Sequence, residues 1–195
     1  MADQSLIERD KTAVVIMDYQ NDIVGGFPEN VRNELLARAS KVLTTARRAG
    51  IPVIYVAVRF REGYPEISSR DEARRGIRQS GRLVEGTQGA EIVPEVVPQP
   101  GEVVVTKRRT GPFSTTDLNA ILNAKGIDTL VLMGVSTSGC VLSAVRWAAD
   151  IDYRLIVIAD CCADRDDEVQ RVLTEKVLPR QATVVNSDEF MQALG

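Results

Sequence analysis

The chain has 195 residues and a formal net charge of −3, with 44% hydrophobic and 26% charged residues. This composition is ordinary for a globular protein, and the small negative charge excludes a general electrostatic attraction to nucleic acid or to an anionic membrane. The sequence contains no histidine, which excludes the commonest general base and every zinc site that depends on imidazole.

Six short apolar segments rich in β-branched residues are predicted to form strands. They are residues 12–17, 52–58, 102–106, 129–134, 154–160 and 182–186. Their residues are apolar throughout instead of alternating with polar ones, which is typical of strands covered on both faces in a parallel sheet.

Four segments between these strands show helical periodicity of their apolar residues. They are residues 35–46, 118–122, 141–149 and 169–173. Ser114 to Asp117 resembles a capping box, which predicts the start of the second of these helices.

Residues 59–101 break the alternation of strand and helix. A segment of this length without a clear strand predicts a short helix around residues 70–79 and a loop that serves a site or a subunit contact. It carries seven arginines and several acidic residues, a pattern that favours a solvated, salt-bridged face over a ligand-binding patch.

The order of these elements predicts a three-layer α/β/α fold with a central six-stranded, mostly parallel, Rossmann-like sheet. Ligand sites in such sheets lie beyond the carboxyl ends of the strands. The residues that follow strands directly are therefore candidates for a site at that edge: Asp18, Arg59, Lys107, Ser136–Cys140 and Asp160–Arg165.

Length and cysteine usage set the expected organisation and location. A chain of this size can form a single domain, taken as residues 1–195. Its three cysteines do not make a disulfide framework, its first residues lack the apolar stretch of a signal peptide, and no apolar run reaches transmembrane length. We therefore expect one domain in the cytoplasm, without a nucleic-acid or membrane partner.

Cys140 lies where the fourth predicted strand gives way to a helix, in the stretch GVSTSGCV. Taken alone, a cysteine at such a position is most often a small hydrophobic residue packed in the core. The alternative is a nucleophile, because a thiol in the first turn of a helix lies at the positive end of the macrodipole, which predicts a lowered pKa. Unpaired N–H groups at that turn can also hold an oxyanion.

Asp18 and Lys107 also follow apolar strands. Each has an ordinary alternative role: Asp18 can form a turn or cap a helix, and Lys107 can extend to solvent beside Arg108 and Arg109. Together with Cys140, however, they place a carboxylate, an ammonium and a thiol at one edge of one sheet. Such a set can carry out acyl transfer without histidine, with Asp18 accepting the thiol proton and Lys107 stabilising the negative charge nearby.

Three motifs stand in order along the chain: MDYQND with Asp18, TKRRTGPFSTTDL with Lys107, and GVSTSGCV with Cys140. They resemble motifs of the isochorismatase-like cysteine hydrolases, the superfamily that includes N-carbamoylsarcosine amidase, maleamate amidase, nicotinamidase and isochorismatase. The similarity covers nearly the whole chain. The resemblance implies an isochorismatase-like hydrolase fold and an Asp–Lys–Cys catalytic triad formed by these three residues.

The resemblance also implies roles for residues around Cys140. It implies a non-proline cis peptide bond between Val135 and Ser136, which turns a backbone N–H toward the oxyanion, with the Cys140 N–H as second donor. It implies substrate contacts by Thr137 and Arg165; for Arg165 the alternative is pairing with a neighbouring aspartate. Family members are commonly dimers or tetramers, so a homodimer or homotetramer is expected by resemblance.

Two departures from known members narrow the expected chemistry. Nicotinamidases carry an aspartate and histidines after the second strand that bind a metal, whereas this chain reads VRFREGYPE there, so we expect neither a metal nor an organic cofactor. True isochorismatases act on a vinyl ether and often lack the cysteine, so its presence favours hydrolysis of a C–N bond.

The sequence therefore predicts a metal-independent amidohydrolase that acts on a small amide, ureido or carbamoyl substrate, with or without a carboxylate. The reaction would pass through a thioester and release ammonia or an amine. Two alternatives stay open: a catalytically idle member that acts by binding or assembly, and a vinyl-ether hydrolase of the isochorismatase type.

Overall fold

The computed structural model describes residues 7–195 and contains one six-stranded, fully parallel sheet. The strand order is β3-β2-β1-β4-β5-β6, so the order reverses between β1 and β4. The strands are β1 (Thr12–Met17), β2 (Val53–Val58), β3 (Val103–Lys107), β4 (Thr129–Val135), β5 (Arg154–Ala163) and β6 (Thr183–Val185). The predicted α/β class and all six predicted strands are confirmed.

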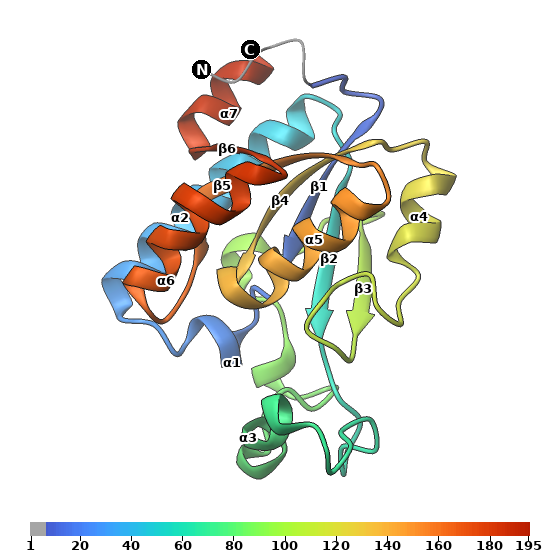
Figure 1. The fold of residues 1–195 in the computed structure, drawn as a ribbon, viewed down its shortest axis with the longest axis vertical. Coiled ribbons are helices and arrows are strands. Elements are labelled where there is room, and N and C mark those ends of the chain that lie inside the picture. Colours follow the sequence, from blue (N-terminus) through green and yellow to red (C-terminus); the bar gives the residue numbers. More distant parts are fainter. Residues whose placement is uncertain (1–6) are drawn as a thin grey trace.

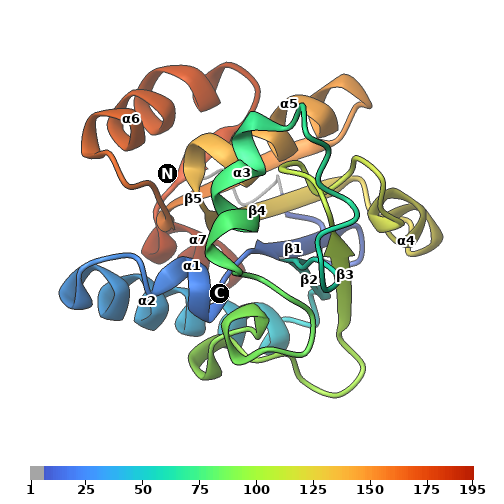
Figure 2. The same ribbon diagram turned by 90° about the horizontal axis from the view of Figure 1, so that it is seen from below.

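Helices cover both faces of the sheet, as Figure 2 shows for α2 on one side and α5 and α6 on the other. The helices are α1 (Asn21–Val24), α2 (Glu29–Arg48), α3 (Glu72–Ser80), α4 (Leu118–Ala124), α5 (Leu142–Asp150), α6 (Asp167–Val172) and α7 (Ser187–Leu194). In addition, α7 packs against α2. None of the helices within residues 7–195 is long and apolar enough to cross a membrane.

The burial of the central strands explains why the sheet could be predicted from the sequence. Every residue of β1, β2 and β4 is buried, because each strand has neighbours on both sides and helices over both faces. Burial on both faces removes the need for polar residues at alternate positions, which produces continuous apolar runs. The core is built around these strands.

The predicted capping box before α4 is wrong. Asp117 is the N-cap of α4, and its side chain makes no capping hydrogen bond. Instead, the Thr116 hydroxyl donates to the Pro112 carbonyl at 2.5 Å and accepts from the Leu118 N–H at 3.3 Å. The preceding Thr115 has a positive φ of 64°, so the segment forms an irregular turn ahead of the helix.

The segment between β2 and β3 contains the predicted short helix, α3. Figure 1 shows α3 beyond the arrowheads of β1, β2 and β3, at the carboxyl edge of the sheet. A small hydrophobic cluster of its own packs this segment against the end of β2; its buried members are Val58, Phe60, Tyr64, Ile67 and Leu83. The long connection therefore lies over the edge where a site is expected.

Candidate active site

The structure brings Asp18, Lys107 and Cys140 together in one cavity at the carboxyl edge of the sheet. Asp18 directly follows β1, Lys107 is the last residue of β3, and Cys140 lies in a π-helical turn, Thr137–Val141, between β4 and α5. All three line a cavity of about 470 Å³. The cavity lies near the reversal in strand order, where ligand sites of such sheets occur.

Asp18 and Lys107 form a buried ion pair. Lys107 Nζ lies 2.6 Å from Asp18 Oδ2, and the two side chains are only 2% and 7% exposed. Lys107 also donates to the Thr110 carbonyl at 2.6 Å. The second carboxylate oxygen, Asp18 Oδ1, is buried and accepts no hydrogen bond from the described part of the chain. One oxygen is therefore held by the ammonium, and the other is free to accept a proton.

Two glycines let the turn with Cys140 approach the sheet closely. A Cβ at Gly134 would lie 3.0 Å from Cys140 Sγ and 3.0 Å from Met17 Cβ, closer than packed atoms tolerate. A Cβ at Gly139 would lie 2.7 Å from Ser136 Oγ. The glycines of GVSTSGCV thus make room for the thiol, which is 1% exposed and donates to the Ser136 carbonyl at 3.4 Å.

The predicted lowering of the thiol pKa is wrong. Burial raises the pKa of Cys140 well above its usual value, the negative charge of Asp18 raises it further, and Lys107 opposes both. Burial also raises the pKa of Asp18, again with Lys107 opposing. The loss of solvation therefore has a larger effect on the pKa of the Cys140 thiol than the positive end of the helix has. The raised pKa favours the neutral thiol of Cys140 in the resting site, so its proton must move as the sulfur reacts.

Alkylation should report this protonation state. We expect iodoacetamide to label Cys140 faster than Cys161 or Cys162, because only Cys140 lines the cavity, while the other two are buried in β5. Burial also raises the pKa of Cys162 to about 12. The Cys140 rate should keep rising between about pH 7 and pH 9, since little thiolate is preformed.

Peptide mass spectrometry over a time course at several pH values measures these rates. A plateau of the Cys140 rate below neutral pH would show a preformed thiolate. Equal, slow labelling of all three cysteines would contradict the accessibility of Cys140 from the cavity.

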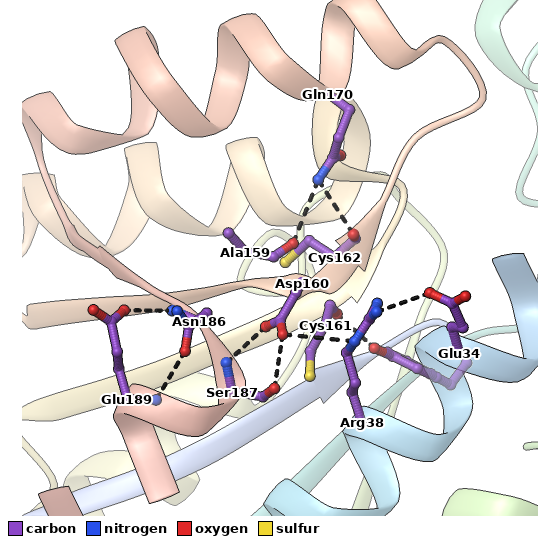
Figure 3. Close-up of polar contacts among 11 residues, drawn as sticks. Glu34, Arg38, Ala159, Asp160, Cys161, Cys162, Gln170, Asn186, Ser187 and Glu189 are labelled. Atoms are coloured by element: carbon purple, nitrogen blue, oxygen red, sulfur yellow. Dashed lines mark hydrogen bonds and ion pairs between the residues drawn. The ribbon is translucent and has the colours of Figure 1, made fainter. Parts of the chain in front are cut away.

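The segment after β5 holds the turn that carries Cys140. The Val135–Ser136 peptide bond is cis. Thr137 is fully buried and donates to Gln170 Oε1 at 2.5 Å, so its hydroxyl points away from the cavity lining. As Figure 3 shows, Gln170 Nε2 in turn donates to backbone carbonyls of β5, at 3.2 Å for Cys162.

Asp164 makes a second hydrogen bond to the turn that carries Cys140. Its Oδ2 accepts the Ser138 N–H at 2.7 Å, and its Oδ1 accepts the Arg165 N–H at 2.9 Å. Arg165 itself lines the cavity, and its side chain has no carboxylate within 4.0 Å in the described chain. Pairing with a neighbouring aspartate, the alternative role for Arg165, is therefore not what the structure shows.

Two other residues expected at the sheet edge have structural roles. Arg59 pairs with Glu91 at 3.3 Å and donates to the Ala90 carbonyl at 3.3 Å. Asp160 accepts both the N–H and the hydroxyl of Ser187 at 2.7 Å, which fixes the start of α7 (Figure 3). Neither lines the cavity. Within residues 7–195, no group of three or more cysteine and acidic side chains could hold a metal ion.

Sequence reasoning missed three cationic residues of the cavity. Arg74, Arg82 and Arg109 all line the cavity. Arg74 and Arg82 belong to residues 59–101, where a solvated, salt-bridged face was expected, and Arg74 does pair with Asp71. Arg109 was expected only as a solvated neighbour of Lys107. The only local signal was the density of arginine in residues 59–101. Which of its arginines face inward depends on how α3 is attached to the sheet, which no local pattern reveals.

The chain is similar to known proteins over most of its length. Residues 12–189 match the family model of the isochorismatase domain. The chain is 30% identical to the ureidoacrylate amidohydrolase of Agrobacterium fabrum, over 92% of this chain and 84% of that protein. It is also 30% identical to the maleamate amidohydrolase of Pseudomonas putida, over 94% and 87%. The solved N-carbamoylsarcosine amidase of Thermoplasma acidophilum matches with a TM-score of 0.76 and 33% identity, over 91% of this chain and 97% of that one.

Proposed function

The chain belongs to the isochorismatase family, and from that membership we propose that it is a metal-independent, cysteine-dependent amidohydrolase. The three relatives named above are amidohydrolases or amidases. The observation that carries the proposal is the convergence of Asp18, Lys107 and Cys140 in one cavity, where one oxygen of Asp18 accepts no hydrogen bond from residues 7–195. The substrate is a small amide, ureido or carbamoyl compound that bears a carboxylate.

The first half of the reaction forms a thioester. Asp18 accepts the thiol proton of Cys140 as the sulfur attacks the carbonyl carbon of the substrate. The backbone N–H groups of Ser136 and Cys140 hold the oxyanion of the tetrahedral intermediate. Asp18 then gives its proton to the departing nitrogen, the C–N bond breaks, and ammonia or an amine leaves.

The second half returns the enzyme to its resting state. Asp18 takes a proton from a water molecule, which attacks the thioester carbonyl, and the C–S bond breaks. The acid leaves, and Asp18 passes the proton that it took from water to the Cys140 sulfur, which restores both groups. Lys107 opposes the effect of burial on the pKa of Asp18 and so favours the carboxylate form that acts as the base in each half-reaction.

Arg165 is the proposed contact for the substrate carboxylate. Arg165 lines the cavity, and its side chain has no ion-pair partner in the described chain. A planar guanidinium can bind a carboxylate through two parallel hydrogen bonds. Thr137 supports the same site indirectly, because its bond to Gln170 steadies the turn that carries Cys140.

An ammonia-release screen tests the proposal. The panel comprises carbamoyl amino acids, maleamate, ureidoacrylate, nicotinamide and simple neutral amides. We expect carboxylated compounds to react fastest, and Arg165→Ala to raise their KM by about 10–100-fold, the effect of losing a charge-assisted hydrogen bond. Neutral amides should be little affected by that substitution.

Arg180→Ala serves as a control, since Arg180 is exposed and lies outside the cavity. Unchanged kinetics of Arg165→Ala on a carboxylated amide would remove Arg165 from the binding site. A clear preference for neutral amides would contradict the proposed substrate class.

A further inference from the structure

The cavity carries an excess of positive charge. Its lining contains five cationic side chains, Arg74, Arg82, Lys107, Arg109 and Arg165, against the two carboxylates of Asp18 and Asp164. Asp18 is already paired with Lys107, and Asp164 accepts two backbone N–H groups. The remaining charge therefore has no counterpart among the residues that line the cavity, and an anionic ligand would supply it.

The arginines that line the cavity differ in whether the protein itself binds their guanidinium groups. Arg74 pairs with Asp71 at 2.7 Å and donates to Thr110 Oγ1 at 2.7 Å. Arg109 donates to the carbonyls of Glu66, at 3.2 Å, and Arg108, at 2.7 Å. The guanidiniums of both are thus engaged by the protein, and both attach the chain around the cavity.

Arg82 differs, because only its backbone is engaged. Its N–H donates to the Ile77 carbonyl at 3.4 Å, and its carbonyl accepts the Tyr64 hydroxyl at 2.8 Å. The next residue, Leu83, donates its N–H to Asp22 Oδ2 at 2.8 Å. Arg82 is half-buried and lines the cavity, and its guanidinium has no ion pair or hydrogen bond to residues 7–195.

The end of α3 determines the backbone position of Arg82. Gly81 adopts a left-handed conformation with a φ of 67°, which ends the helix, and its N–H donates to the Ile77 carbonyl. At the other end of the helix, Asp71 accepts the Arg74 N–H. Arg74 then attaches the helix to Thr110, in the loop after β3. The backbone of Arg82 is thus held in place while its side chain is free to bind a ligand.

We propose that Arg82 is a specificity-determining residue that binds a negatively charged group of the substrate inside the catalytic cavity. Together with Arg165, it selects small amides that carry a carboxylate, because two unengaged guanidiniums favour a planar anion over a neutral group. The inference rests on the proposed function, since the anion belongs to the molecule whose amide Cys140 attacks. An arginine that merely extends to solvent would not discriminate between anionic and neutral substrates.

A pair of matched substrates tests this role. For maleamate, we expect Arg82→Gln to lower kcat/KM by about 10–100-fold, mainly through KM, and Arg82→Lys to recover part of the loss. For the neutral methyl ester of maleamate, the change should stay below about 3-fold. The matched control is Arg78→Gln, an exposed arginine of α3 outside the cavity, which should leave the kinetics with both substrates unchanged.

Binding without turnover provides a second readout. In a Cys140→Ser background, calorimetry should show that Arg82→Gln weakens binding of the maleate dianion by about 10-fold or more. Circular dichroism and the thermal midpoint establish that each variant is folded. Unchanged maleate binding, no maleate binding at all, or an equal loss for both substrates would overturn the role of Arg82.

The experiments distinguish a failure of the proposed amidohydrolase reaction from a failure of the proposed role of Arg82. If the protein hydrolyses maleamate and Arg82→Gln changes neither kcat/KM nor maleate binding, the inference about Arg82 falls and the amidohydrolase stands. If no amide is hydrolysed but maleate binds in a manner that depends on Arg82, the anion site stands and the proposed reaction falls.

Discussion

Replacing Cys140 with serine is expected to lower ammonia release by about 10⁴-fold or more, the scale seen when a covalent nucleophile is removed. The hydroxyl is far less acidic than the thiol, and Asp18 can no longer produce a competent nucleophile by taking its proton. The two side chains are nearly isosteric, so the fold should persist, with a loss of about 1–3 kcal/mol for burying a hydroxyl. Steady-state ammonia release and chemical denaturation measure the two effects.

Cys162→Ser is the matched control for this experiment. Cys162 is also buried, at 5% exposure, but lies in β5 outside the cavity lining. It should lose a similar amount of stability while keeping most of the activity. Activity that survives in Cys140→Ser, or an equal loss in a folded Cys162→Ser, would contradict the role of Cys140 as nucleophile.

Replacing Lys107 with methionine is expected to damage both stability and activity. The substitution leaves the Asp18 carboxylate buried without its ion-pair partner, a change that typically costs about 3–5 kcal/mol. Lys107 now opposes the effect of burial on Asp18, so its removal raises the pKa of that carboxyl further. A protonated Asp18 cannot accept the thiol proton, and we expect kcat at neutral pH to fall by about 10²–10⁴-fold, the contribution of a general base.

The loss of stability in Lys107→Met should depend on pH in a defined direction. A carboxyl whose pKa is raised in the folded state binds its proton more tightly there than in the unfolded chain. The variant is therefore least impaired below the unfolded pKa of about 4 and becomes less stable as pH rises toward the folded pKa. Denaturation curves at acidic and neutral pH, each compared with wild type, measure the difference.

The double variant Asp18→Asn, Lys107→Met separates stability from catalysis. Since both charges are removed, it should be more stable at neutral pH than the sum of the single substitutions predicts, yet remain inactive. Strictly additive losses would show that the ion pair does not couple the two residues. Activity in the double variant would remove both residues from the proposed mechanism.

The fold followed from the sequence because the central strands are buried on both faces and the edge strands are also apolar. Apolar runs located every strand, and only the ends differ. β5 continues to Ala163 because the register shifts between Leu132 and Gly134 on β4, which admits extra residues on β5. The polar residues before α4 suggested a capping box, but the chain there forms a turn that engages the same side chains differently.

The candidate site was predictable only in part. The proposed catalytic residues follow from the topology of the sheet, whereas other features of the site depend on tertiary contacts and on depth of burial. Asp18, Lys107 and Cys140 each follow a strand, so the topology of a parallel sheet is enough to bring them together. The position of Arg82 depends instead on tertiary contacts of an irregular segment, such as the bond from Leu83 to Asp22. Local sequence does not encode such contacts.

The pKa of the Cys140 thiol also depends on the whole fold. The prediction for Cys140 considered only the end of the following helix, whereas depth of burial, a property of the whole fold, determines the direction of the shift. Thr137 shows the same dependence, since its hydroxyl is directed by Gln170, a residue from the segment beyond β5.

The most direct test of the proposed mechanism is mass spectrometry of enzyme quenched with acid during turnover of a carboxylated amide. We expect an acyl group, equal in mass to the substrate less ammonia, on the peptide that contains Cys140, and its disappearance once the substrate is exhausted. Steady ammonia release while Cys140 stays unmodified, or undiminished release after Cys140 has been alkylated, would contradict thioester catalysis by this residue.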